Sequence, residues 1–86
     1  MANDQHLDLV IVVSGVPQPV RVNAREDLGH AVREALRLSG NPGQAPEEFE
    51  LRTEDGVLLD LTVRAGQLGL VDGTTLFLNP RAGVGG

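Results

Sequence analysis

Residues 23–39 read NAREDLGHAVREALRLS, and they contain the one helical pattern around which the rest of the fold can be built. Their apolar side chains recur at three- and four-residue intervals and therefore share one helical face: Leu28, Ala31, Val32, Ala35 and Leu36. Gly40 is suited to end such a helix, and Pro42 prevents it from continuing. One amphipathic helix cannot bury its own apolar face, so we expect a sheet to cover it.

Alternation of apolar and polar residues predicts strands on both sides of the helix. Before the helix we expect a strand at 7–14, a turn at 15–19 and a short strand at 20–22. After it we expect strands at 49–54, 57–59 and 74–78. Residues 60–73 form an irregular connection that offers four side chains to the core: Leu61, Val63, Leu68 and Leu70.

The resulting order of elements is ββαβββ. It predicts an α+β fold in which a mixed sheet of four to five strands packs on one helix, the arrangement called a β-grasp. We expect this domain to span 7–78, with a flexible N-terminus at 1–6. Residues 79–86, NPRAGVGG, show no periodicity and are predicted to form a flexible C-terminal tail.

Composition excludes several functional classes. There is no cysteine, which excludes a disulfide framework, a thiolate metal site and a cysteine nucleophile. The net charge of −5 argues against a nucleic-acid partner, because phosphate binding needs a concentrated basic surface. No apolar run approaches the roughly 20 residues of a membrane-spanning helix, and the first residues lack the basic start of a signal peptide. We therefore expect a cytoplasmic location without membrane contact.

No catalytic constellation is evident. His6 and His30 have no cysteine or suitably spaced partner, and we interpret both as solvated side chains. The 12 carboxylates are scattered, and no pair of them stands out as acid–base machinery. The glycine-containing stretches 40–43 and 66–69 do not lie between a strand and a helix, so we expect no phosphate cradle. The sequence thus predicts a protein that is not an enzyme and binds no metal and no cofactor.

The order of elements and several sequence stretches resemble the ubiquitin-like family. The resemblance covers the chain after residue 6: the hairpin, the helical stripe, the strand and turn at 49–56, and the run 67–78, QLGLVDGTTLFL, that leads into the last strand. Gly85 and Gly86 then follow at about the family's usual distance. All 7 basic residues are arginine. With this lysine-free composition the chain looks most like the bacterial ubiquitin-like proteins encoded with activating enzymes, conjugating enzymes and JAB-type peptidases in phage-defence operons.

The resemblance implies that the chain is a substrate of these enzymes and modifies target proteins. Gly86 would be the point of conjugation, with Gly85 giving it access to narrow active sites, because glycine has no Cβ. The activating enzyme would consume ATP, so the chain itself needs no cofactor. Arg81 matches the basic residue that helps the family's activating enzymes to recognise the tail. Val84 stands where many members carry a second arginine, which argues against ordinary ubiquitin enzymes as partners.

Two other functions fit the same sequence. A sulfur carrier of the thiamine or molybdopterin type shares the fold and the Gly-Gly end but carries a thiocarboxylate. A β-grasp interaction module would assemble without covalent chemistry. The neighbouring genes and the effect of removing Gly85 and Gly86 would distinguish these alternatives.

The sheet face opposite the helix is predicted to bind a protein. In a β-grasp the first and last strands are neighbours, so Val10, Val12 and Phe77 would lie together and point away from the helix. Three apolar side chains on adjacent strands form a patch, and such patches on small proteins mark interaction sites. Phe77 would be the anchor, because aromatic side chains dominate interface energetics. A second copy of the chain is one candidate partner, and ubiquitin-like folds use this same face for recognition.

Overall fold

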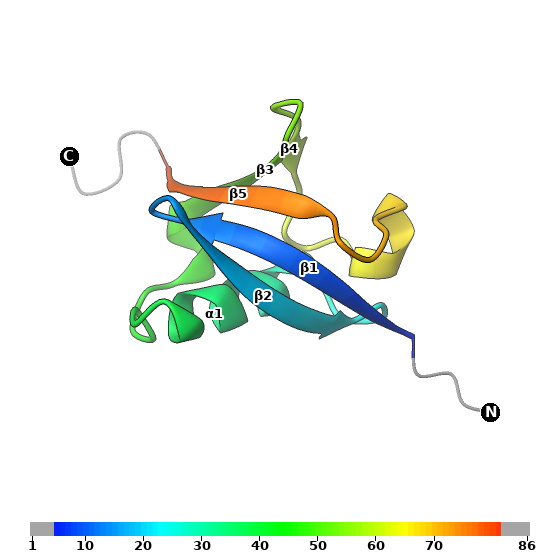
Figure 1. The fold of residues 1–86 in the computed structure, drawn as a ribbon, viewed down its shortest axis with the longest axis horizontal. Coiled ribbons are helices and arrows are strands. Elements are labelled where there is room, and N and C mark those ends of the chain that lie inside the picture. Colours follow the sequence, from blue (N-terminus) through cyan, green and yellow to red (C-terminus); the bar gives the residue numbers. More distant parts are fainter. Residues whose placement is uncertain (1–4, 82–86) are drawn as a thin grey trace.

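The computed structural model describes residues 5–81 of the 86-residue chain. One helix, α1 (Leu28–Leu38), lies across one face of a five-stranded sheet (Figure 1). The strands are β1 (His6–Val13), β2 (Val16–Asn23), β3 (Phe49–Thr53), β4 (Leu58–Leu59) and β5 (Thr75–Pro80). Two short 3-10 turns cover Pro46–Glu48 and Ala65–Leu68. The predicted ββαβββ order and α+β class are confirmed.

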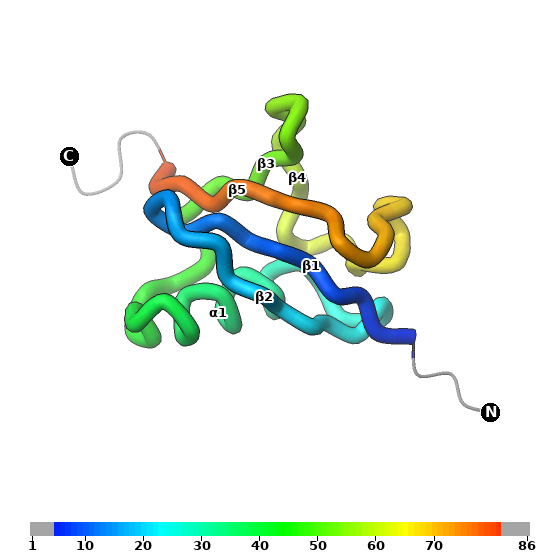
Figure 2. The backbone as a smooth tube through the Cα atoms, viewed as in Figure 1, coloured from blue at the N-terminus to red at the C-terminus, as the bar shows by residue number. Residues whose placement is uncertain are grey.

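The strands follow the order β2-β1-β5-β3-β4 across the sheet. Figure 2 shows β1 running between β2 and β5. The β1–β5 pair is parallel and the other pairs are antiparallel, so the sheet is mixed. The central strands β1 and β5 come from opposite ends of the sequence. Their register places Ile11 beside Leu76 and Val12 beside Phe77.

The core lies between α1 and the inner face of the sheet. All five residues of the predicted helical stripe are buried, and so are the inner-face residues of the central strands: Leu9, Ile11, Val13, Leu76 and Leu78. Leu61, Leu68 and Leu70 pack against this core as expected, whereas Val63 is not among the residues that do. Ala65, which no sequence pattern indicated as a core residue, is fully buried at the start of the second 3-10 turn.

The helix begins at Leu28, five residues later than the predicted start at 23. Asn23 still belongs to β2, and its N–H donates to the Glu26 carboxylate. Asp27 then caps the helix by accepting a hydrogen bond from the N–H of His30 at 3.1 Å. At the other end, Gly40 has a φ of +88° and its N–H donates to Arg37, the pattern of a Schellman cap.

The first hairpin differs from the prediction in the length of its turn. Ser14 and Gly15 alone form the turn, with φ values of +52° and +81°, as a two-residue type I′ turn requires. The second strand therefore starts at Val16 and includes Pro17 and Pro19, which the prediction assigned to the turn. Proline is tolerated here because β2 is an edge strand, where half of the backbone N–H groups face away from the sheet.

Gly66 should be the glycine that tolerates a side chain least. A Cβ at this position would lie 2.9 Å from the Cβ of Ala24 and 3.0 Å from its carbonyl oxygen, to which the Gly66 N–H donates. We expect Gly66→Ala to lower the free energy of unfolding by about 1–3 kcal/mol, since the two segments must move apart. Gly43→Ala is the matched control, because a Cβ there meets nothing within 4 Å. Urea unfolding measures both; equal stability of the two variants would contradict the prediction.

Candidate functional site

The root of the predicted tail is part of the fold. β5 extends to Pro80, and the N–H and Nε of Arg81 donate to the carbonyls of Glu48 and Glu47 at 2.9 and 3.0 Å. The predicted boundary between the domain and the tail, at residues 78 and 79, is therefore wrong by about three residues. Pro80 has no N–H, but none is needed on the β1 side of the strand at this position, because the last β1–β5 pair is Val13 with Leu78. Gly85, Gly86 and Val84 lie outside the described residues.

The other predicted boundary also shifts. β1 begins at His6 rather than at residue 7, and the N–H of Ala24 donates to the carbonyl of Gln5 at 2.8 Å. This hydrogen bond continues the β1–β2 pairing by one step. The folded part therefore includes residues 5 and 6, which the sequence analysis assigned to a flexible N-terminus.

Val10, Val12 and Phe77 lie together on the sheet face opposite α1, as predicted. Val12 is the direct neighbour of Phe77 across the β1–β5 pair, and Val10 is the neighbour of Thr75. All three apolar side chains are half-buried, whereas the residues on either side of them in sequence are buried against the helix. We call these three residues the outer patch; its role in binding remains a prediction.

The outer patch is the centre of a longer row that the sequence analysis missed. The register pairs Val12 with Pro17 on one side, and Phe77 with Arg52 on the other. Arg52 in turn pairs with Leu58, which is 50% exposed. Arg52 is held in place by hydrogen bonds to the Gly56 carbonyl and the Glu50 carboxylate. Alternation within each strand points to these residues, but only the register brings them into one line.

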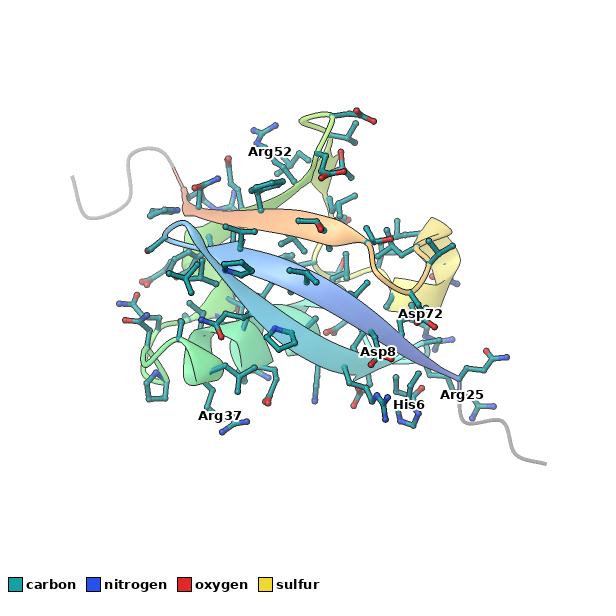
Figure 3. The ribbon with its side chains drawn as sticks, viewed as in Figure 1. His6, Asp8, Arg25, Arg37, Arg52 and Asp72 are labelled. Atoms are coloured by element: carbon teal, nitrogen blue, oxygen red, sulfur yellow. The ribbon has the colours of Figure 1, made fainter. Side chains whose placement is uncertain are left out.

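The other end of the same face is charged. Asp8 accepts two hydrogen bonds from Arg21, at 2.8 and 3.3 Å, and the carboxylate of Asp72 accepts one from the Asp8 N–H. Figure 3 shows Asp8, Asp72 and His6 near the start of β1, well away from Arg52. The hydrogen bond from Arg21 lowers the pKa of Asp8, and the nearby charges of Arg21 and His6 act in the same direction. A partner of the outer patch would thus meet an apolar centre with an ion pair beside it.

Arg21→Gln should raise the pKa of Asp8 toward its ordinary value. A carboxyl whose pKa is depressed by folding stabilises the protein above its unfolded-state pKa, and this contribution is lost as the pH falls through the folded-state value. The free energy of unfolding of the parent should therefore exceed that of the variant near neutral pH. This difference should shrink as the pH falls from the ordinary pKa of an aspartate to the lowered pKa of Asp8. NMR titration of the Asp8 carboxyl measures the shift. Arg25→Gln is the control, and an Asp8 pKa that is the same in both variants would contradict the assignment.

No metal-binding or membrane-spanning feature is found in the described part of the chain. Within residues 5–81, no three histidine, aspartate or glutamate side chains gather in a way that could hold a metal ion. The Nε2 of His30 lies 3.3 Å from the Oε2 of Glu26, which precedes the helix, and both side chains are well exposed. The helix among these residues is too short to cross a membrane.

The sequence of the chain matches a known protein family. Residues 2–86 match the family model described as "Protein of Unknown function (DUF2604)". The chain belongs to this family. It is also 38% identical over 81 residues to a protein of Sinorhizobium fredii, "Uncharacterized protein y4jI". The matched region covers 93% of this chain but only 62% of the length of that relative.

Solved structures confirm the ubiquitin-like fold of this family member. Caldiarchaeum subterraneum ubiquitin superimposes with a TM-score of 0.72 at 25% identity, covering 94% of this chain and 99% of that one. A protein designed on the basis of ubiquitin has a TM-score of 0.78 at 20% identity, covering 98% and 99%. The EccD5 ubiquitin-like domain of Mycobacterium xenopi has a TM-score of 0.71 at 21% identity, covering 90% and 96%. The resemblance inferred from the sequence is thus confirmed for the fold.

Proposed function

We propose that this chain is a ubiquitin-like modifier that is joined to target proteins through Gly86. The observation that supports it most is the position of Gly85 and Gly86 shortly after a last strand that ends at Pro80, in a ubiquitin-like fold. In this proposal the chain is a substrate rather than an enzyme, and it binds no metal and no cofactor of its own.

The chemistry would be supplied by partner enzymes. The Gly86 carboxylate attacks the α-phosphate of ATP on an activating enzyme, which releases pyrophosphate and forms an acyl adenylate. A cysteine thiolate of that enzyme then displaces AMP to form a thioester, and the thiol of a conjugating enzyme takes over the acyl group. An amine of the target finally displaces the thiol and forms an amide. A JAB-type peptidase would hydrolyse that bond again.

Arg81 is proposed as the residue that such enzymes recognise at the base of the tail. Its N–H and Nε are bonded to the carbonyls of Glu48 and Glu47, which fixes the direction of the guanidinium group. The remaining guanidinium nitrogens donate to no other residue within 5–81. A fixed guanidinium with free donors suits recognition of a carboxylate on a partner. Val84, closer to Gly86, would select against enzymes that require a second arginine.

The missing lysines restrict the linkages that the modifier can make with itself. An isopeptide bond requires an ε-amine, and the chain contains none. Polymers would have to use the α-amine at the N-terminus or an ester to a hydroxyl group such as that of Ser14, Ser39 or Thr62. We propose that the chain acts in a bacterial cytoplasm, that it is encoded in a phage-defence operon, and that it forms no lysine-linked chains with itself.

A second candidate function is non-covalent assembly through the outer patch. It is supported by the juxtaposition of Val10, Val12 and Phe77, each half-buried, on the sheet face opposite α1. The two functions are compatible, since a conjugated modifier also needs a surface that its readers bind. They differ in whether the carboxyl group of Gly86 forms a covalent bond with a target.

Digestion of conjugates with two proteases tests the proposal. The chain is expressed with the enzymes encoded beside it, and its covalent products are purified. Trypsin cleaves after Arg81 and should leave the remnant Ala82-Gly83-Val84-Gly85-Gly86 on lysines of target peptides. A lysine-specific protease cannot cut the modifier and should leave all 86 residues attached.

Three outcomes decide between the functions. Remnants on target lysines support the modifier. A free chain in which sulfur replaces one Gly86 carboxylate oxygen, without any remnant, would identify a sulfur carrier instead. An unmodified Gly86 in cells where the protein is active would leave non-covalent assembly as its function.

A further inference from the structure

A hollow of about 420 Å³ lies at one side of the sheet, where β4 ends. Its apolar lining comes from four side chains: Phe49, Leu58, Leu59 and Leu61. Three of them also pack against the core, so the hollow has a firm floor, while Leu58 is half exposed at its mouth. A concave apolar surface with polar groups around it is the usual form of a binding site.

A second hollow adjoins the first one on the side of the helix. It has a volume of about 210 Å³, lies beside the first turns of α1 and shares Glu47, Leu61 and Thr62 with the first hollow. We call the two adjoining hollows the β4 groove. Two hollows side by side can take successive residues of an extended peptide.

The backbone beside the groove has an unused acceptor. β4 ends at Leu59, before it reaches the first residues of β3. The Phe49 N–H donates to the Pro46 carbonyl. The Phe49–Pro80 pair exchanges no hydrogen bond, because the next residue, Arg81, donates to Glu48 and hydrogen-bonded pairs alternate along an antiparallel ladder, so the Phe49 carbonyl faces away from β5. The Phe49 carbonyl therefore has no strand partner within residues 5–81. An extended peptide in the groove can donate to it, as a strand added to a sheet edge does.

The opposite edge of the sheet is closed to a strand. The Ala24 N–H donates to Gln5, just before β1, whereas the N–H and carbonyl of Asn23 turn away from β1 and bond to Glu26. Because backbone groups alternate in direction along β2, the N–H and carbonyl groups at positions 17, 19 and 21 also point away from β1. Two of these positions are proline, so the N–H of Arg21 is the one donor left on that edge. An incoming strand cannot pair there, which leaves the β3–β4 side as the open edge.

The charges around the groove define the peptide. Three carboxylates, those of Glu47, Glu50 and Asp60, line the larger hollow together with Arg81. The smaller hollow adds Asp27, His30 and Arg33, so carboxylates outnumber arginines four to two around the groove. Glu50 is already paired with Arg52, and hydrogen bonds from the hydroxyl and the N–H of Thr62 lower the pKa of Asp60. The excess negative charge favours a peptide that carries lysine or arginine beside its apolar residues.

We propose that the β4 groove binds an extended segment of a partner protein in which apolar and basic residues alternate. An apolar side chain fills the hollow, a basic side chain faces Glu47 and Asp60, and a backbone N–H donates to the Phe49 carbonyl. This binding does not involve Gly86 and does not depend on the proposed conjugation.

NMR titration with a defined peptide tests this proposal. The probe is acetyl-Gly-Leu-Arg-Leu-Arg-Leu-Gly-amide, in which alternation places the leucines on one side of a strand and the arginines on the other. Added to the isotope-labelled full chain, it should shift the amide signals of residues 47–50 and 58–62. The same peptide with glutamate in place of arginine should bind at least about fivefold more weakly, because it meets like charges at the rim.

Matched variants locate the site. Leu58→Asp should weaken binding about tenfold, since it places a charge at the mouth of the hollow, and Glu47→Arg should weaken it about two- to fivefold. Val71→Asp and Glu54→Arg introduce the same charges at exposed positions outside the groove, and both variants should bind the probe like the parent. Amide spectra without probe verify that each variant is folded.

Three results would overturn the proposal. One is the absence of shifts at millimolar probe. Another is equal binding of the glutamate peptide. The third is a set of shifts centred on Val12 and Phe77, with binding lost in Phe77→Ser, because that would place the peptide on the outer patch.

Discussion

A chain shortened to Val84 should form no adenylate with its activating enzyme, although it folds like the full chain. Removing two residues shortens the reach of the C-terminal carboxylate by about 7 Å, and the new terminal residue carries a branched side chain into a site suited to glycine. The last contacts of the described fold, from Arg81 to Glu47 and Glu48, are retained. We therefore expect an unchanged melting temperature.

Pyrophosphate release and intact-mass detection of the AMP-linked chain measure this loss. Gly86→Ala is the matched control, since it keeps the length and the carboxylate and should retain part of the activity. If the shortened chain were still adenylated or found on targets, Gly86 would not be the point of conjugation.

Leu76→Ala should be the most damaging of the single substitutions on β5. Leu76 is fully buried at the centre of the sheet, between Ile11 and Thr53. Truncating such a leucine removes its packing and leaves a cavity, which costs about 2–5 kcal/mol. For a domain of this size that loss lowers the melting temperature by roughly 10 °C or more.

Phe77→Ala provides the comparison, because it truncates the next residue on the opposite face of the same strand. Phe77 is half-buried, so we expect at most half of the loss seen at Leu76. Chemical denaturation of both variants measures the difference. A larger loss at Phe77 would show that the outer patch is covered in solution, for example by a second copy of the chain.

The core and the outer patch could be predicted because both follow from local periodicity. A three- and four-residue interval places Leu28 and Leu36 on one helical face, and alternation separates Leu76 from Phe77. The order of elements then determines that β1 and β5 are neighbours in a β-grasp. These features need no knowledge of any particular long-range contact.

Features that depend on long-range contacts could not be predicted. The helix starts late because the carboxylates of Glu26 and Asp27 serve the end of β2 and the helix cap instead of a helical turn. Asn79 and Pro80 look like the end of a strand, yet β3 pairs with both of them. The sequence predicts the end of the strand at Leu59, but the β4 groove depends on how residues 60–62 lie beside the start of β3, and the sequence contains no signal for that placement.

The closed β2 edge also limits how copies of this protein can associate through their sheets. Head-to-tail stacking, in which the β4 side of one copy pairs with the β2 side of the next, would grow without end and give fibres. Pro17 and Pro19 remove the donors that such a step requires. Only the β4 sides of two copies can pair with each other, and a symmetric pair of this kind is complete at two. Many copies crowded onto one target would therefore remain discrete particles instead of nucleating a filament.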